Sequence, residues 1–124
     1  MDNINTDNKT AIIAITKKGI GLAKQIQNML DDSDIYVPDK FRDSDSKIIY
    51  FKEPVSQKLG SLFSNYSSLV CLFSLGAVIR LISPVLKDKK SDPAVIVIDD
   101  TAKFVISALS GHLGGANELT LRIS

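Results

Sequence analysis

The stretch Ala11-Ile12-Ile13-Ala14-Ile15 decides the fold, because five consecutive apolar residues make one strand and leave it without a polar face. A strand without alternation is covered on both sides, as in a parallel sheet packed between helices. Thr16 follows and can cap a helix. The apolar residues of the next segment fall on one helical stripe: Leu22, Ile26, Met29 and Leu30. This part of the chain therefore predicts a buried strand followed by an amphipathic helix.

The rest of the chain alternates in the same way. Further strands are predicted at 35–37, 48–51, 69–73 and 94–98, and helices at 55–65 and 75–86. Pro84 is expected to kink or end the second of these helices. A turn at 99–102 should return the chain over 103–109 as an antiparallel hairpin. The sum is an α/β fold: a three-layer sandwich with a mostly parallel sheet and a C-terminal β-hairpin leading into a last helix.

The composition fits one small domain, with 124 residues of which 44% are hydrophobic. We expect residues 1–9 to form a disordered tail ahead of a domain spanning 10–124. A formal net charge of +1 and the lack of tryptophan argue against a nucleic-acid partner. The polar start and the absence of a bilayer-length apolar run favour a cytoplasmic protein without a membrane partner.

The single cysteine and single histidine exclude a Cys/His zinc cluster within this chain, so no metal site is expected. Cys71 lies in the apolar run at 69–73, and we interpret it as a buried small hydrophobic residue rather than a nucleophile.

A glycine-rich turn is the strongest candidate site: Ser110-Gly111-His112-Leu113-Gly114-Gly115-Ala116-Asn117-Glu118 follows the apolar run Phe104–Leu109. Glycines let main-chain N–H groups approach a ligand closely, and a following helix adds unpaired donors with a partial positive charge. The turn therefore suits a carboxylate or a phosphate. The alternative is a tight strand-to-helix turn with a surface histidine.

Two other strand-to-helix turns carry glycines, namely Gly19 and Gly21 in one and Gly76 in the other. Arg80 lies about one turn beyond Gly76. Ligands of open α/β sheets bind outside the carboxyl ends of the strands, so we expect the turns after Ile15, Phe73 and Leu109 to line one edge. Arg80 could equally be a solvated surface charge.

Two stretches go beyond a general α/β pattern: SLGAVIRLISPVLKDKKSDPAV at Ser74–Val95 and FVISALSGHLGGANEL at Phe104–Leu119. In their order and separation they resemble the N-terminal domain of the CbiG family of cobalamin biosynthesis proteins, the cobalt-precorrin-5A hydrolases. The resemblance covers the second half of the chain, from about Ser56 onward. Family members usually carry a second, C-terminal domain, which is expected to be a required partner.

The resemblance implies the anaerobic route to vitamin B12 and a defined reaction. The δ-lactone of cobalt-precorrin 5A is opened by hydrolysis, giving cobalt-precorrin 5B and acetaldehyde. Cobalt is carried by the corrinoid substrate, so no cofactor is implied.

Lactone hydrolysis needs an activated water and stabilisation of a tetrahedral oxyanion. The candidate catalytic residues are His112, as general base, and Ser110, which could orient the imidazole or itself attack. The candidate substrate-binding residues, which would hold carboxylates or the oxyanion, are Gly76, Arg80, Gly111, Gly114, Gly115 and Asn117.

Two other functions remain open. A non-catalytic module would bind the corrinoid or dock on a partner domain that performs the chemistry. A nucleotide-binding domain is the third alternative, because Gly19-Ile20-Gly21 starts like a dinucleotide fingerprint. Lys24 stands where the third glycine belongs, which favours close helix–strand packing instead.

Overall fold

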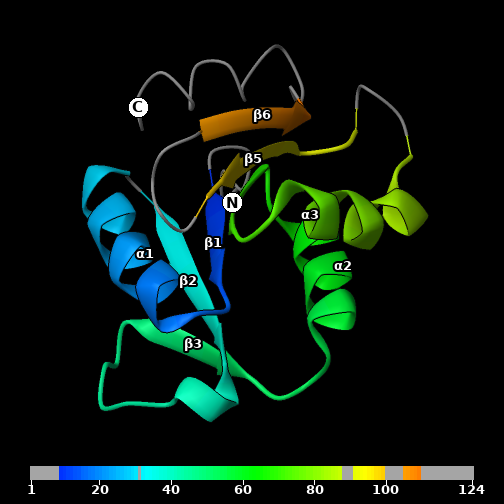
Figure 1. Ribbon diagram of the computed structural model, residues 1–124. Coiled ribbons are helices and arrows are strands. Elements are labelled where there is room, and N and C mark those ends of the chain that lie inside the picture. The colour runs from blue at the N-terminus through cyan, green and yellow to red at the C-terminus, as the bar shows by residue number, and fades with distance from the viewer. Residues whose placement is uncertain (1–8, 31, 88–90, 100–104, 110–124) are drawn as a thin grey trace, which may run out of the picture.

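The computed structural model describes residues 9–30, 32–87, 91–99 and 105–109, which form a six-stranded sheet with helices on both faces (Figure 1). The elements, in chain order, are β1 (Thr10–Ala14), α1 (Lys17–Met29), β2 (Ser33–Pro38), the 3₁₀ turn η2 (Asp39–Phe41), β3 (Ile48–Phe51), α2 (Val55–Asn65), β4 (Ser68–Leu72), α3 (Leu75–Ile82), the 3₁₀ turn η3 (Ser83–Val85), β5 (Ala94–Ile98) and β6 (Val105–Leu109). The expected α/β class is confirmed. The predicted last helix and residues 1–8 of the predicted tail lie outside the described residues.

The strand order of the sheet is β3-β2-β1-β4-β5-β6. The first five strands run parallel, and β6 pairs antiparallel with β5, so the expected hairpin is confirmed. β1 lies in the middle and pairs with β4 from Thr10↔Ser68 to Ala14↔Leu72. The chain therefore builds the sheet outward from β1, first to one side and then to the other.

Each face of the sheet has its own apolar core, since successive residues of a strand point to opposite faces. The core under α1 contains Ile12, Ala14, Ala23, Ile26, Val70 and Ile96. The core under α2 and α3 contains Ala11, Ile13, Leu59, Phe63, Cys71 and Val78. All five residues of β1 are buried, which explains why its sequence has no polar alternation.

α1 begins as expected at Thr16, whose Oγ1 accepts a hydrogen bond of 2.9 Å from the Gly19 amide. The expected apolar stripe is only partly right. Ile26 and Leu30 are buried, but Met29 is 47% exposed and Ala23 faces the sheet instead. The stripe that packs against the sheet consists of Ala23, Ile26 and Leu30, which follow Gly19 at i+4, i+7 and i+11.

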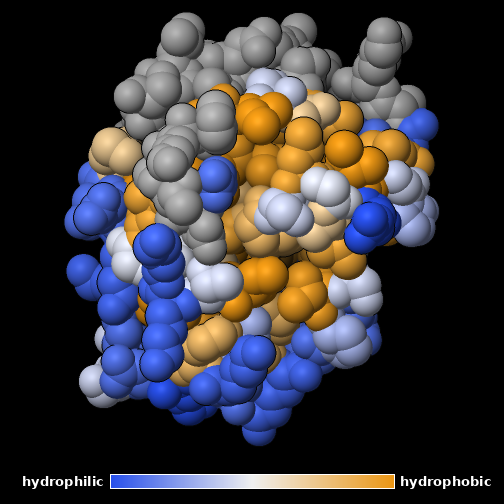
Figure 2. Space-filling model, viewed as in Figure 1, coloured by the Kyte–Doolittle hydropathy of each residue, from blue (hydrophilic) through white to orange (hydrophobic). Residues whose placement is uncertain are grey.

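α3 ends at Ile82, where Pro84 and its neighbours form the short turn η3, as the proline predicted. Val78 and Ile82 are buried, whereas Ile79 and Leu86 are 49% and 46% exposed. Figure 2 shows hydrophobic residues gathered on the α3 side of the molecule and hydrophilic ones over α1. No helix in the described part of the chain is long and apolar enough to cross a membrane.

Gly19 lets α1 approach the sheet closely. A Cβ at this position would lie 3.0 Å from Thr16 Oγ1, 3.4 Å from the Leu72 carbonyl oxygen and 3.5 Å from Ala14 Cβ. A Cβ at Gly21 would meet nothing within 4 Å. The interpretation of Gly19 as a close helix–strand contact is therefore confirmed.

We expect Gly21→Ala to raise the free energy of unfolding by about 0.5–1 kcal/mol, because alanine favours a helix interior over glycine. Gly19→Ala should gain less or lose stability, because its methyl group disturbs the Thr16 cap and the Leu72 carbonyl. Urea unfolding of the two variants beside the native chain measures both values. Equal stabilisation by the two substitutions would contradict the close packing at Gly19.

Candidate functional site

The strand order reverses between β1 and β4, and this reversal makes a topological switch point at their carboxyl ends. The connections to the two sides of the sheet diverge there, and ligands of open α/β sheets bind at such points. Ala14 and Leu72 are the paired last residues of the two strands. The candidate site is therefore this carboxyl edge of the sheet.

Two helices begin at the switch point. α1 is capped by Thr16, and α3 is capped by Ser74, whose Oγ accepts a hydrogen bond of 3.3 Å from the Ala77 amide. Neither first turn contains an acidic residue. Because free amides and the helix dipole make such ends partially positive, this part of the edge attracts anions.

Gly76 and Arg80 lie on the same exposed side of α3, four residues apart. A Cβ at Gly76 would meet nothing within 4 Å, so the helix surface is open there. In the described ranges, Arg80 forms no ion pair and its side chain is exposed. The structure thus brings together two of the residues expected to bind substrate.

We expected the turn after Leu109 at this carboxyl edge. The expectation is wrong for Leu109 itself, the residue from which the turn starts. β6 runs antiparallel to β5. Val105 therefore pairs with Ile98 at the end of β5, and Leu109 pairs with Val95 near its start. The chain therefore leaves β6 beside the start of β5, at the opposite edge from the ends of β1 and β4. Ser110, Gly111, His112, Gly114, Gly115 and Asn117 themselves lie outside the described residues.

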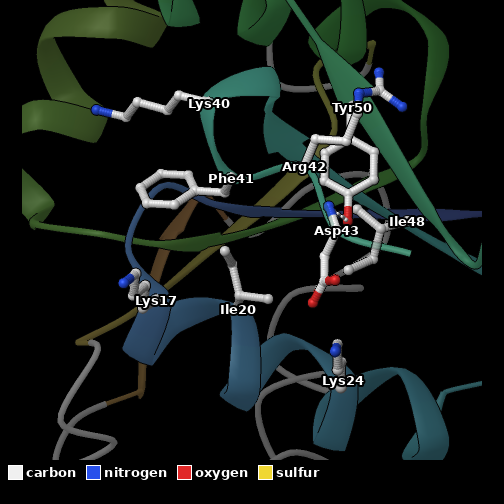
Figure 3. A pocket seen from close by; sticks show the side chains of 9 residues that line it. All are labelled: Lys17, Ile20, Lys24, Lys40, Phe41, Arg42, Asp43, Ile48 and Tyr50. Atoms are coloured by element: carbon white, nitrogen blue, oxygen red, sulfur yellow. Dashed lines mark hydrogen bonds between the residues drawn. The ribbon is translucent and has the colours of Figure 1, made fainter. Parts of the chain in front are cut away.

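Two cavities at the carboxyl edge were missed by the analysis of single motifs. The first, which we call the Phe41 cavity, has a volume of about 350 Å³ and lies between α1 and the segment from η2 to β3. Lys17, Ile20 and Lys24 line it from α1, and Lys40, Phe41, Arg42, Asp43, Ile48 and Tyr50 line it from the other side (Figure 3). The second, of about 440 Å³, lies beyond the ends of β1, β2 and β3, between Ile15, Pro38 and Val55. Lys40 lines both.

Part of the charge at the Phe41 cavity is already neutralised. Arg42 is bound to Asp39 at 2.6 Å, and its guanidinium carbon lies 4.7 Å from the centre of the Tyr50 ring. Lys24 forms an ion pair of 3.2 Å with Asp45. The Lys47 amide, and then Lys24, lower the pKa of Asp45, so this carboxylate stays charged.

Cys71 is fully buried in the α2/α3 core, as expected, and burial raises the pKa of its thiol to about 12. A thiol that stays protonated cannot act as a nucleophile near neutral pH. No cluster of three or more possible metal ligands occurs among the residues that the structure describes.

A second polar group, at the amino edge of the sheet, was also missed. Tyr66 Oη donates to Asp34 Oδ2 at 2.7 Å and lies 2.5 Å from Tyr36 Oη, and Lys9 pairs with Asp34 at 3.3 Å. Burial, followed by these hydrogen bonds, raises the pKa of Tyr66 above its usual range. All its members have partners, so this group ties β2 to the end of α2.

The fold and the edge together define the class of protein: an open α/β domain that presents helix N-termini and cationic side chains beyond its parallel strands. The sequence comparison then gives the family. Residues 57–124 match the family model described as "Cobalamin synthesis G N-terminal", and the chain belongs to this family.

Similar proteins carry a consistent name. The chain is 49% identical over 117 residues to a cobalt-precorrin-5A hydrolase of Priestia megaterium and 37% identical over 110 residues to one of Salmonella typhimurium. These matches cover 92% and 89% of this chain but only 31% and 30% of those proteins. The chain therefore spans about a third of the length of the curated relatives it matches.

A solved structure supports the fold. A cobalamin biosynthesis protein G homolog from Sulfolobus solfataricus superposes with a TM-score of 0.70 at 21% identity. The match covers 96% of this chain and 35% of that one.

We expect Cys71 in the folded protein to resist Ellman's reagent at about pH 8 and to react at once in urea, because its thiolate is both rare and inaccessible. Fast labelling of the folded protein would contradict the burial of the Cys71 thiol.

The raised pKa also predicts a dependence of stability on pH. The unfolded thiol ionises near 9 and the folded one near 12, so this contribution is intact below about pH 9 and declines between the two values. The decline is at most about 1.4 kcal/mol per pH unit. Cys71→Ala is the control, since its stability should fall less steeply over that range. Equal slopes for the two proteins would contradict the assignment.

Proposed function

We propose that this chain is the substrate-binding part of a cobalt-precorrin-5A hydrolase in cobalamin biosynthesis. The observation that carries the proposal is the 49% identity over 117 residues with the Priestia megaterium protein of that name. The proposed reaction is hydrolysis of the δ-lactone of cobalt-precorrin 5A to cobalt-precorrin 5B and acetaldehyde. Cobalt arrives with the substrate, and the chain needs no cofactor of its own.

The carboxyl edge has the chemistry that such a substrate requires. A corrinoid with acetate and propionate arms is a flat apolar ring with a negatively charged rim. The N-termini of α1 and α3 and the exposed Arg80 offer N–H donors and positive charge to the rim. Gly76 leaves room for an arm to approach α3 closely.

The catalytic roles in this proposal belong to His112 and Ser110. An imidazole has a pKa suited to removing a proton from the attacking water near neutral pH. Ser110 would orient the ring or attack the lactone itself. The amides of Gly111, Gly114 and Gly115 and the side chain of Asn117 would hold carboxylates or the oxyanion. The rest of a longer protein, about twice the length of this chain in the relatives, would complete the active site.

A second candidate function is a non-catalytic module that binds the corrinoid or docks on the rest of the enzyme. One observation favours it. Ile79 and Leu86 are large apolar side chains that are about half exposed on the α3 side, which suits a covering domain.

The test is a chimera in which this chain replaces the matching third of the Priestia megaterium protein, assayed for acetaldehyde release. His112→Ala should lower turnover by about 100-fold or more, the usual contribution of a general base, while corrinoid binding changes by less than about twofold. Lys18→Gln, an exposed substitution on α1, is the matched control and should leave both values unchanged.

Unchanged acetaldehyde release in His112→Ala would remove this residue from the mechanism and support the non-catalytic module. Binding of a cobalt corrinoid by the 124-residue chain alone would show that this chain holds the substrate without the rest of the enzyme.

A further inference from the structure

The Phe41 cavity combines positive charge with apolar walls. Four cationic side chains and a single acidic one, Asp43, line a volume of about 350 Å³. This volume is at the small end of the range for ligand pockets. It accommodates a small molecule or one arm of a larger one, and not a whole tetrapyrrole ring.

The four cations fall into two pairs. Lys24 and Arg42 are held by Asp45 and Asp39, as described above. Within the ranges that the structure describes, Lys17 and Lys40 form no ion pair, and Lys40 lies over the Phe41 ring at 5.2 Å from its centre. The uncompensated charge of the cavity is therefore concentrated on these two lysines.

The charges are also separated in space. In Figure 3 the Phe41 ring lies between Lys17 and Lys40, whereas Asp43 extends toward Lys24 on the other side of Ile20. Asp43 Oδ1 accepts a hydrogen bond of 2.7 Å from the Ser44 amide, so the carboxylate is held on that side. An anionic group is thus attracted to the Lys17 and Lys40 end and repelled from the Asp43 end.

The walls between the two ends are apolar and rigid. Ile20 and Ile48 contribute aliphatic surface, and Phe41 contributes a ring face. Tyr50 is fixed from two directions, since Arg42 covers its ring and the Asp43 amide donates to its hydroxyl at 3.2 Å. A ligand with a short hydrocarbon stem would replace water along these walls.

We propose that the Phe41 cavity binds a carboxylate on a short aliphatic stem, with the carboxylate at the end that carries Lys17 and Lys40 and the stem against Phe41 and Ile20. The source of this group is either a peripheral arm of a corrinoid, in which case the inference deepens the proposed function, or a free aliphatic acid. The shared chemistry is the same in both cases.

The experiment titrates the 124-residue chain with three probes: cobyrinic acid, which has free carboxylate arms, its heptamethyl ester, which has none, and glutarate. Calorimetry at low ionic strength gives the dissociation constants. Cobyrinic acid should bind at least about 10-fold more tightly than the ester. The double substitution Lys17→Gln with Lys40→Gln should weaken cobyrinic acid binding by about 10-fold or more, because it removes both partners of the carboxylate.

Lys18→Gln removes one positive charge, where the double variant removes two, from the position of α1 next to Lys17. Lys18 does not line the cavity, so this substitution should change binding by less than about twofold. Phe41→Ala should weaken glutarate but leave the binding of inorganic phosphate unchanged, since phosphate has no stem. Far-UV circular dichroism verifies that each variant keeps its fold.

The outcomes separate this inference from the proposed function. If cobyrinic acid and glutarate both bind equally well to the double variant, the cavity proposal is overturned while corrinoid binding stands. If glutarate binds and is lost in the double variant but cobyrinic acid does not bind, the cavity is confirmed and the corrinoid source is wrong. Equal losses in Lys18→Gln and in the double variant, or no binding of any carboxylate up to about 10 mM, overturn the proposal.

Discussion

The pairing of β1 with β4, both buried on both faces, is the constraint on which the rest of the structure depends. Every residue of β1 is buried, and its backbone groups can be satisfied only by neighbouring strands. Parallel strands require crossover connections, and of the helices in these connections α1 packs on one face while α2 and α3 cover the other. Gly19 permits a close contact of α1 with the sheet, because a Cβ at this position would lie 3.4 Å from the Leu72 carbonyl oxygen at the end of β4.

The same constraint creates the functional edge. Reversal of strand order at β1 and β4 brings two helix N-termini to this edge, with no acidic residue in either first turn. Cationic side chains from α1 and η2 extend the attraction for anions beyond β2 and β3. At the opposite edge, Tyr36, Tyr66, Asp34 and Lys9 satisfy one another and serve packing. The two ends of the sheet therefore differ in the charge that they offer to a ligand.

Much of the candidate site could be predicted from local sequence. Thr16 and Ser74 are recognisable caps, and Gly76 and Arg80 are four residues apart on one helix, so their common face follows from helix geometry. The Phe41 cavity could not be predicted, because its walls come from α1, η2 and β3, which meet only after the sheet has formed. The position of Leu109 was misjudged although the hairpin was predicted. An antiparallel strand ends where its partner begins, so the end of β6 lies beside the start of β5. It is therefore at the opposite edge of the sheet from the ends of β1 and β4.

The sequence by itself determined the α/β class, the order of the elements and the family, since each depends on apolar runs, helical spacing and short motifs that are local in the chain. Only the tertiary structure decided which face of each helix is covered, as Met29 and Ile79 show by remaining half exposed. It also decided which lysines of the Phe41 cavity have an ion-pair partner among the described residues. The physical reason is that burial and ion pairing depend on neighbours from distant segments, whereas helix and strand formation depend mainly on neighbours along the chain.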